Sequence, residues 1–94
     1  MNEQLTLISV TAKGNSFSRT ETEKRTTVFC TEKSIGQKEF FAAEAQGLKA
    51  EYKLEMWAFE YSGEKFAEYK NQKFSVYRTY KVNDKMEIYL ASEG

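Results

Sequence analysis

The sequence predicts a mostly β domain, a small antiparallel barrel or sandwich of about six strands, with one short α-helix between the second and third strands. Three observations support this class. A helical pattern changes to strict alternation at Gly47, in the middle of the chain. The last third repeats short strands separated by polar turns. Aromatic residues make up 15% of the sequence, which indicates a packed core in a single domain spanning residues 1–94.

The first expected strand is Leu5–Ala12, whose apolar residues fall on both parities, so we expect both of its faces to be covered. Lys13–Glu23 is polar and contains the turn signal Gly14-Asn15, which predicts a loop or a long flexible hairpin. Phe17 is the only large apolar residue of this segment. We favour packing of Phe17 back onto the end of the sheet over contact with a neighbouring subunit.

The second expected strand is Lys24–Lys33, with Val28 and Cys30 on one face. Cys30 is the only cysteine, which excludes an intrachain disulfide and a multi-cysteine metal site and fits a reducing cytosol. The chain contains no histidine that could activate the thiol. We therefore expect Cys30 to be a small buried apolar residue.

The expected helix is Gln37–Gln46, with Ser34 and Gln37 spaced as a capping box and Gly47 at the position that ends a helix. Such a short helix must pack on the sheet to be stable. Phe40 and Phe41 are adjacent and therefore point about 100° apart around the helix. We expect one of them to enter the core and the other to face a partner.

The third expected strand is Lys49–Tyr61, the longest clean alternation in the sequence. Its expected inward residues are Ala50, Tyr52, Leu54 and Met56. The alternation fails at Trp57, because Trp57 and Phe59 fall on the parity of the charged residues before them. We expect a bulge or a second buried surface at this end of the strand.

The last third is expected to form a meander of three strands, Lys65–Tyr69, Phe74–Lys81 and Lys85–Ala91. In the last of these, Met86, Ile88 and Leu90 are expected to face inward. In the strand before it, the expected inward residues are Phe74, Val76, Arg78 and Tyr80. An arginine among inward residues is expected to pair with a buried acid or to lie over an aromatic ring.

Charge and composition exclude several function classes. Fourteen basic and fourteen acidic residues cancel, so the chain lacks the basic excess that supports non-specific binding to nucleic acid. The absence of histidine excludes a Ser-His-Asp or Cys-His arrangement. The glycines are single, so no phosphate-binding loop is present. We expect no catalytic residues, no cofactor and no metal, and no apolar run approaches the roughly twenty residues that span a bilayer.

The order of these motifs resembles a known family. The resembling segments are LTLISV, TTVFCTEKS, the helix QKEFFAAEAQG, KAEYKLEMW, the turn EYSGE and the C-terminal YKNQKFSVYRTYKVNDKMEIYLAS. Together they span about Leu5 to Leu90, and they resemble the head-closure proteins, also called head–tail joining or stopper proteins, of long-tailed bacteriophages and prophages. Many members of that family open with an arginine-rich segment, whereas this chain opens with MNEQ.

The resemblance implies a small β-barrel that acts structurally in the neck of a virion. It implies assembly into a dodecameric ring beneath the portal and adaptor, where the ring retains packaged DNA and offers a docking surface to the tail. The DNA would pass through the ring lumen without sequence-specific binding. The expected locations are the virion neck and, during assembly, the host cytoplasm.

Two groups of residues are candidates for this role. The candidate partner-interface residues are Phe40, Phe41, Glu44, Trp57 and Phe59. The candidate residues of a loop that faces the lumen are Lys13, Gly14, Asn15, Phe17 and Arg19. Two other functions remain open. One is an oligonucleotide-binding barrel that uses the basic and aromatic segment KNQKFSVYRTYK, and the other is a different neck or tail-completion subunit.

Overall fold

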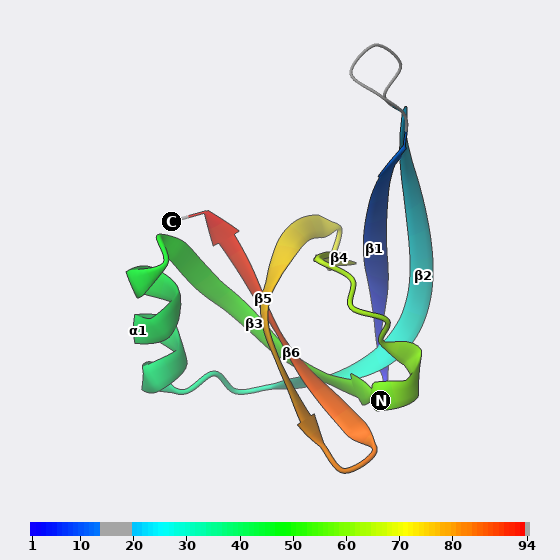
Figure 1. The fold of residues 1–94 in the computed structure, drawn as a ribbon. Coiled ribbons are helices and arrows are strands. Elements are labelled where there is room, and N and C mark those ends of the chain that lie inside the picture. Colours follow the sequence, from blue (N-terminus) through cyan, green and yellow to red (C-terminus); the bar gives the residue numbers. More distant parts are fainter. Residues whose placement is uncertain (14–19, 94) are drawn as a thin grey trace.

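The computed structural model describes residues 1–13 and 20–93 (Figure 1). Its elements, in chain order, are β1 (Glu3–Lys13), β2 (Thr20–Lys33), α1 (Gln37–Ala45), β3 (Leu48–Trp57), the 3-10 turn η1 (Ala58–Glu60), β4 (Phe66–Tyr69), β5 (Gln72–Val82) and β6 (Lys85–Glu93). The mostly β class, the six strands and the helix between the second and third strands are confirmed.

The six strands form one closed antiparallel barrel in the order β1-β2-β3-β6-β5-β4. Closure comes from β4, which pairs with β5 on one side and with Thr6–Ile8 of β1 on the other. The β1–β2 hairpin continues beyond this pairing, because Val10–Lys13 pairs only with Thr20–Glu23. Figure 1 shows this hairpin projecting from the barrel.

The described residues of the polar segment Lys13–Glu23 all belong to strands. Lys13 ends β1, and Thr20–Glu23 belongs to β2, so the strand pair is longer than the apolar pattern predicts. Hydrogen bonding between the two backbones extends the hairpin where the side chains carry no apolar signal. Of the two alternatives, a long hairpin describes the chain better than a loop.

The barrel interior holds the hydrophobic core. The core residues are Leu5, Leu7, Val28, Cys30, Leu54, Met56, Ala67, Tyr69, Phe74, Ile88 and Leu90. Tyr52 packs edge-on against Tyr69, with ring centroids 4.9 Å apart, and against Phe74, at 5.5 Å. The predicted inward positions of β6 and most of those of β3 are thus confirmed. Ile8 is also fully buried, on the opposite face of β1 from Leu7, as the two-parity pattern predicts.

Two bulges against β6 change the faces that simple alternation predicts. On β3, Ala50 pairs with Ala91 and Tyr52 with Leu90, so the extra residue between them turns Ala50 outward. On β5, Val76 pairs with Leu90 and Arg78 with Tyr89. The predictions that Ala50, Arg78 and Tyr80 face inward are wrong, because a bulge reverses the parity of every position beyond it. Among the described residues, neither the bulge nor the second buried surface expected at the end of β3 is present, because Trp57 pairs in register with Lys85 and both Trp57 and Phe59 are exposed.

Helix α1 packs on the outer face of the barrel, against β3. Its buried residue is Ala43, and two small residues that the register places on the outer face, Ala50 and Ala91, are buried as well. Neither phenylalanine enters the core: Phe40 is 43% exposed and Phe41 is 64% exposed. The prediction of one buried phenylalanine is wrong, because Ala43 is the residue that the helix buries against the sheet.

The prediction for the start of the helix is wrong, and the prediction for its end is confirmed. The capping box at Ser34 and Gln37 is wrong, since the N-cap is Gly36 and no side chain caps it. The Gly36 carbonyl accepts hydrogen bonds from the backbone N–H groups of Glu39 and Phe40 instead. At the other end, Gly47 has a φ of +74° and donates its N–H to the Glu44 carbonyl, so the predicted helix stop is confirmed.

The third strand ends earlier than predicted, at Trp57, and the turn η1 follows it. Residues 61–64, where the sequence predicts a turn, form an irregular connection and not a regular turn. Gly63 has a φ of +83°, and the Glu64 carboxylate, itself nearly buried, accepts a 2.6 Å hydrogen bond from the backbone N–H of Ser62. This network holds the segment that leads into β4.

We expect Leu54→Ala to lower the free energy of unfolding by about 2–5 kcal/mol, because it leaves a cavity at a fully buried site of the closed barrel. Urea unfolding followed by fluorescence measures the change. Phe41→Ala is the matched control, since it truncates an exposed side chain and should shift the value by less than about 0.5 kcal/mol. Equal losses in the two variants would contradict the assignment of the core.

Candidate functional site

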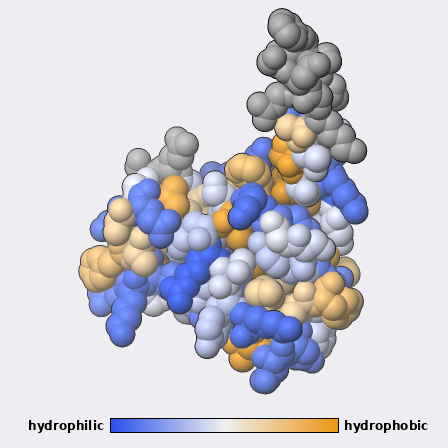
Figure 2. Space-filling model, in the orientation of Figure 1, coloured by the Kyte–Doolittle hydropathy of each residue, from blue (hydrophilic) through white to orange (hydrophobic). Residues whose placement is uncertain are grey.

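The predicted interface residues are all exposed, but the structure separates them into two groups. Phe40, Phe41 and Glu44 lie on α1, beside the start of β3. Trp57 ends β3 and Phe59 lies in η1, at the other end of the same strand. Figure 2 shows hydrophobic groups over the helix and again at the lower right of this face, with hydrophilic groups between them.

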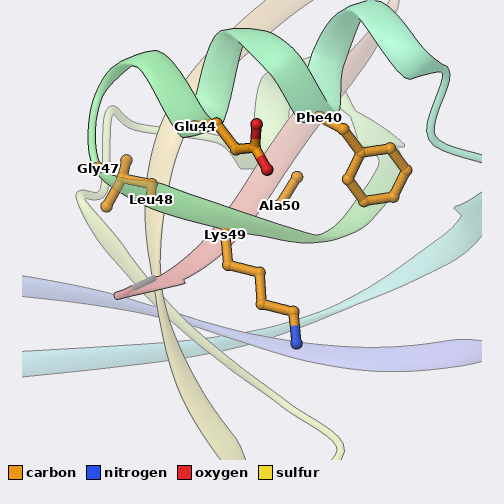
Figure 3. A pocket seen from close by; sticks show the side chains of 6 residues that line it. All are labelled: Phe40, Glu44, Gly47, Leu48, Lys49 and Ala50. Carbon is orange, nitrogen blue, oxygen red and sulfur yellow. The ribbon is translucent and has the colours of Figure 1, made fainter.

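The first group lines a groove between α1 and the beginning of β3, which we call the helix groove. Its volume is about 470 Å³, and its lining residues are Phe40, Glu44, Gly47, Leu48, Lys49 and Ala50. In Figure 3 the Phe40 ring and the Glu44 carboxylate stand on the helix side, with Ala50 on the strand between them, while the Lys49 side chain points away from the helix. The groove is therefore apolar at its base, with one carboxylate on its rim.

The second group forms a protrusion, which we call the aromatic turn patch and define as Trp57 and Phe59. The two rings stack with centroids 6.5 Å apart and planes 29° from parallel, and Phe59 is 82% exposed. The Lys85 ammonium lies 5.2 Å from the centre of the Trp57 ring. The turn is held by a 2.9 Å hydrogen bond from the Ala58 N–H to the Asp84 carbonyl. The patch is therefore fixed in its exposed position by contacts within the chain.

A polar cluster ties the helix to the barrel between these two surfaces. Glu39, in the first turn of α1, forms an ion pair with Arg78 and accepts a 3.2 Å hydrogen bond from the Tyr77 hydroxyl. The Arg78 guanidinium lies 5.5 Å from the centre of the Tyr89 ring, which is almost fully buried. Of the two alternatives predicted for Arg78, lying over an aromatic ring is confirmed, and Arg78 also pairs with a partly buried acid, although it does both on the outer face. Burial, followed by the nearby Glu39 charge, raises the pKa of Tyr77 to about 12.

Sequence reasoning did not identify Glu39 as the partner of Arg78. Thirty-nine residues separate the two positions, and the pairing depends on where the helix rests on the barrel. The one available signal was the arginine itself, which predicts an acidic partner without indicating which one.

A second cluster lies at the mouth of the barrel. The Tyr69 hydroxyl donates a 2.9 Å hydrogen bond to Glu32, and Lys70 approaches the same carboxylate at 3.2 Å. The Tyr69 hydrogen bond is the largest cause of the lowered pKa of Glu32. Nearby, burial raises the pKa of the Cys30 thiol to about 11, which matches the prediction of a buried, unreactive residue.

Of the candidate lumen residues, only Lys13 lies within the part of the chain that the structure describes. Lys13 is the last residue of β1. Gly14, Asn15, Phe17 and Arg19 lie outside the described residues. The described part of the chain contains no group of three or more potential metal ligands. Within the same residues, no helix is long and apolar enough to cross a membrane.

Comparison with known proteins finds no matching family model, no matching curated protein and no matching solved structure.

The raised pKa of Tyr77 predicts an alkaline effect on stability. A phenol whose pKa is about 12 in the folded chain and about 10 when unfolded stabilises the fold fully below pH 10, and this contribution is lost between pH 10 and 12. We expect Tyr77→Phe to be less stable than the parent by about 1 kcal/mol at pH 8, because the hydrogen bond to Glu39 is lost. The difference in the free energy of unfolding between the parent and Tyr77→Phe should become smaller as the pH rises towards 12.

Urea unfolding at a series of pH values measures both effects. Tyr80→Phe is the control, because the Tyr80 side chain is exposed and should give a nearly constant, small difference. A stability difference between the parent and Tyr77→Phe that stays constant up to pH 12 would refute the assignment of this tyrosine to the polar cluster.

Proposed function

We propose that this chain is a structural subunit of a bacteriophage or prophage neck. In this role it forms a ring below the portal and adaptor, closes the head so that packaged DNA is retained, and provides a docking surface for the tail. The observation that carries the proposal is a closed barrel that keeps two aromatic surfaces exposed and extends one hairpin beyond its body.

The order of elements supports the proposal. The resemblance implies a small barrel with one helix between the second and third strands, and the chain has this arrangement. A neck subunit needs contact area on several sides, because it touches neighbouring copies and the rings above and below. The exposed rings of Phe40, Phe41, Trp57 and Phe59 supply such area without contributing to the core.

The helix and the hairpin are given different parts in this proposal. The exposed face of α1, with Phe40 or Phe41, docks on a ring partner. The β1–β2 hairpin projects from the barrel, and residues 14–19 follow β1 and precede β2 in the sequence, so this part of the chain is the candidate for the ring lumen. The barrel serves as the rigid frame that holds both.

An oligonucleotide-binding barrel is the weaker candidate. It would stack bases on the tyrosines of the segment KNQKFSVYRTYK. Tyr77 is held by Glu39 and lies 6.0 Å from Tyr89, whose ring is almost fully buried. The Arg78 guanidinium forms an ion pair with the same Glu39 carboxylate. These contacts leave Tyr80 as the exposed tyrosine of the segment, which disfavours a stacking platform there.

We expect a knockout of this gene, in the phage or prophage that carries it, to yield heads that package DNA and then lose it, beside free complete tails. Electron microscopy of lysates and measurement of nuclease-protected DNA test this. Supplying the gene from a plasmid should restore filled, tailed particles. Knockout heads that retain DNA and carry tails would refute the proposal, and salt-dependent binding of single strands by the purified chain would then favour the oligonucleotide-binding alternative.

Deletion of residues 15–20 is expected to leave the barrel folded, because the pairing that closes the barrel lies at Thr6–Ile8, away from the hairpin tip. The same deletion should reduce DNA retention in the complemented knockout. Circular dichroism checks the fold, and nuclease-protected DNA checks the function. Full retention with the deleted chain would show that the hairpin tip does not close the lumen.

A further inference from the structure

We infer that the aromatic turn patch of one copy docks into the helix groove of the next copy. The inference rests on the proposed ring function and specifies which surfaces of neighbouring copies meet. It depends on two complementary shapes, a protruding pair of rings and an apolar groove, on one face of one chain.

The shapes of the two surfaces match. Phe59 projects from η1 with 82% of its surface exposed, and the stacked Trp57 supports it from one side. The helix groove, about 470 Å³ in volume, has Phe40, Leu48 and Ala50 in its lining. A groove of this kind accommodates an aromatic side chain, and aromatic side chains are the usual anchors of protein interfaces.

The aromatic turn patch is rigid before it binds. The Ala58 N–H bonds to the Asp84 carbonyl, and the Tyr61 N–H bonds to the Ala58 carbonyl at 3.2 Å. Lys85 lies over the Trp57 ring. Because these contacts already fix the rings, docking costs little conformational entropy, which favours binding through a small area.

A chain cannot fill its own groove with this patch. Ala50 and Trp57 both face outward, because their partners Ala91 and Lys85 lie on the same face of β6. Seven residues of extended strand separate them, a distance of about 20 Å. The two surfaces must therefore meet between copies, either head to tail, which generates a closed ring or a filament, or reciprocally in a two-fold dimer; the proposed ring requires the head-to-tail contact.

Each of the two surfaces carries charges of both signs. Glu44 and Lys49 line the helix groove, and Asp84 borders the depression beside Phe59 together with Lys81, while Lys85 lies over Trp57. Among the described residues, neither Glu44 nor Lys81 takes part in an ion pair within the chain. Docking of the turn into the groove brings Glu44 towards Lys81 and Lys85, so opposite charges meet at the edge of an apolar contact.

The first test is sedimentation equilibrium of the purified chain up to millimolar concentration. We expect the parent chain to self-associate, and Phe59→Ala and Phe40→Ala each to weaken the association at least tenfold. Phe41→Ala is the matched control, since Phe41 is the neighbouring phenylalanine of the helix, is more exposed than Phe40, and does not line the groove. A monomeric parent chain, or an equal effect of Phe41→Ala, would overturn the inference.

A mixing experiment tests whether the aromatic turn patch of one copy fills the helix groove of another, and growth of the parent chain beyond a dimer identifies the head-to-tail contact. Phe59→Ala retains an intact helix groove, and Phe40→Ala retains an intact aromatic turn patch. An equimolar mixture should form heterodimers that grow no further, although each variant alone stays monomeric. If Phe40→Ala alone still dimerises, the patches meet each other and the inference is wrong. A mixture that stays monomeric also overturns it.

Exchanging the charges of Glu44 and Lys81 tests whether these two side chains meet at the rim of the helix groove. Glu44→Lys and Lys81→Glu should each weaken self-association, and the double variant should recover a large part of it. Failure of the double variant to recover would overturn the pairing of these surfaces. These measurements use only the purified chain, so they are independent of the knockout. Association through these surfaces together with normal DNA retention in the knockout would refute the neck function and leave the docking contact standing.

Discussion

Pairing between β1 and β4 is the constraint on which the rest of the barrel depends. It involves only Thr6–Ile8 and Phe66–Glu68, yet it joins the two ends of a six-stranded sheet. A single sheet has no second layer to cover its apolar face, so closure onto itself takes the place of that layer. Leu7 and Ala67 face each other across this pairing and are fully buried. Without it, the inner faces of all six strands would be open to water.

Because the interior is filled by the barrel strands themselves, the outer face is free to serve contacts. Two bulges against β6 place Ala50 on that face and bring Arg78 beside Tyr89. The ion pair between Glu39 and Arg78 joins the helix to β5, and small buried residues lie between the helix and the sheet. This close packing leaves Phe40 and Phe41 outside, and the turn η1 holds Phe59 outside as well. The surfaces of the proposed ring contacts thus result from the way the helix and turn are attached.

Much of the fold could be predicted from local patterns. Alternation located the strands and most of the core, since Leu54, Met56, Ile88 and Leu90 need only a period of two. Gly47 marked the end of the helix because its conformation suits few other residues. The candidate interface residues are all exposed, although one of the two phenylalanines was expected in the core. Their division into two surfaces was not predicted, because the length of β3 separates them and no local pattern expresses that distance.

The sequence by itself determined the β class, the place of the helix and the burial of Cys30, because each follows from periodicity or from the chemistry of one residue. Tertiary structure alone decided the closure by β4, the two bulges, and the pairing of Glu39 with Arg78 and Tyr77. Each of these depends on segments far apart in the chain meeting in a particular register. A bulge reverses the face of every residue beyond it, and only the partner strand decides where it falls.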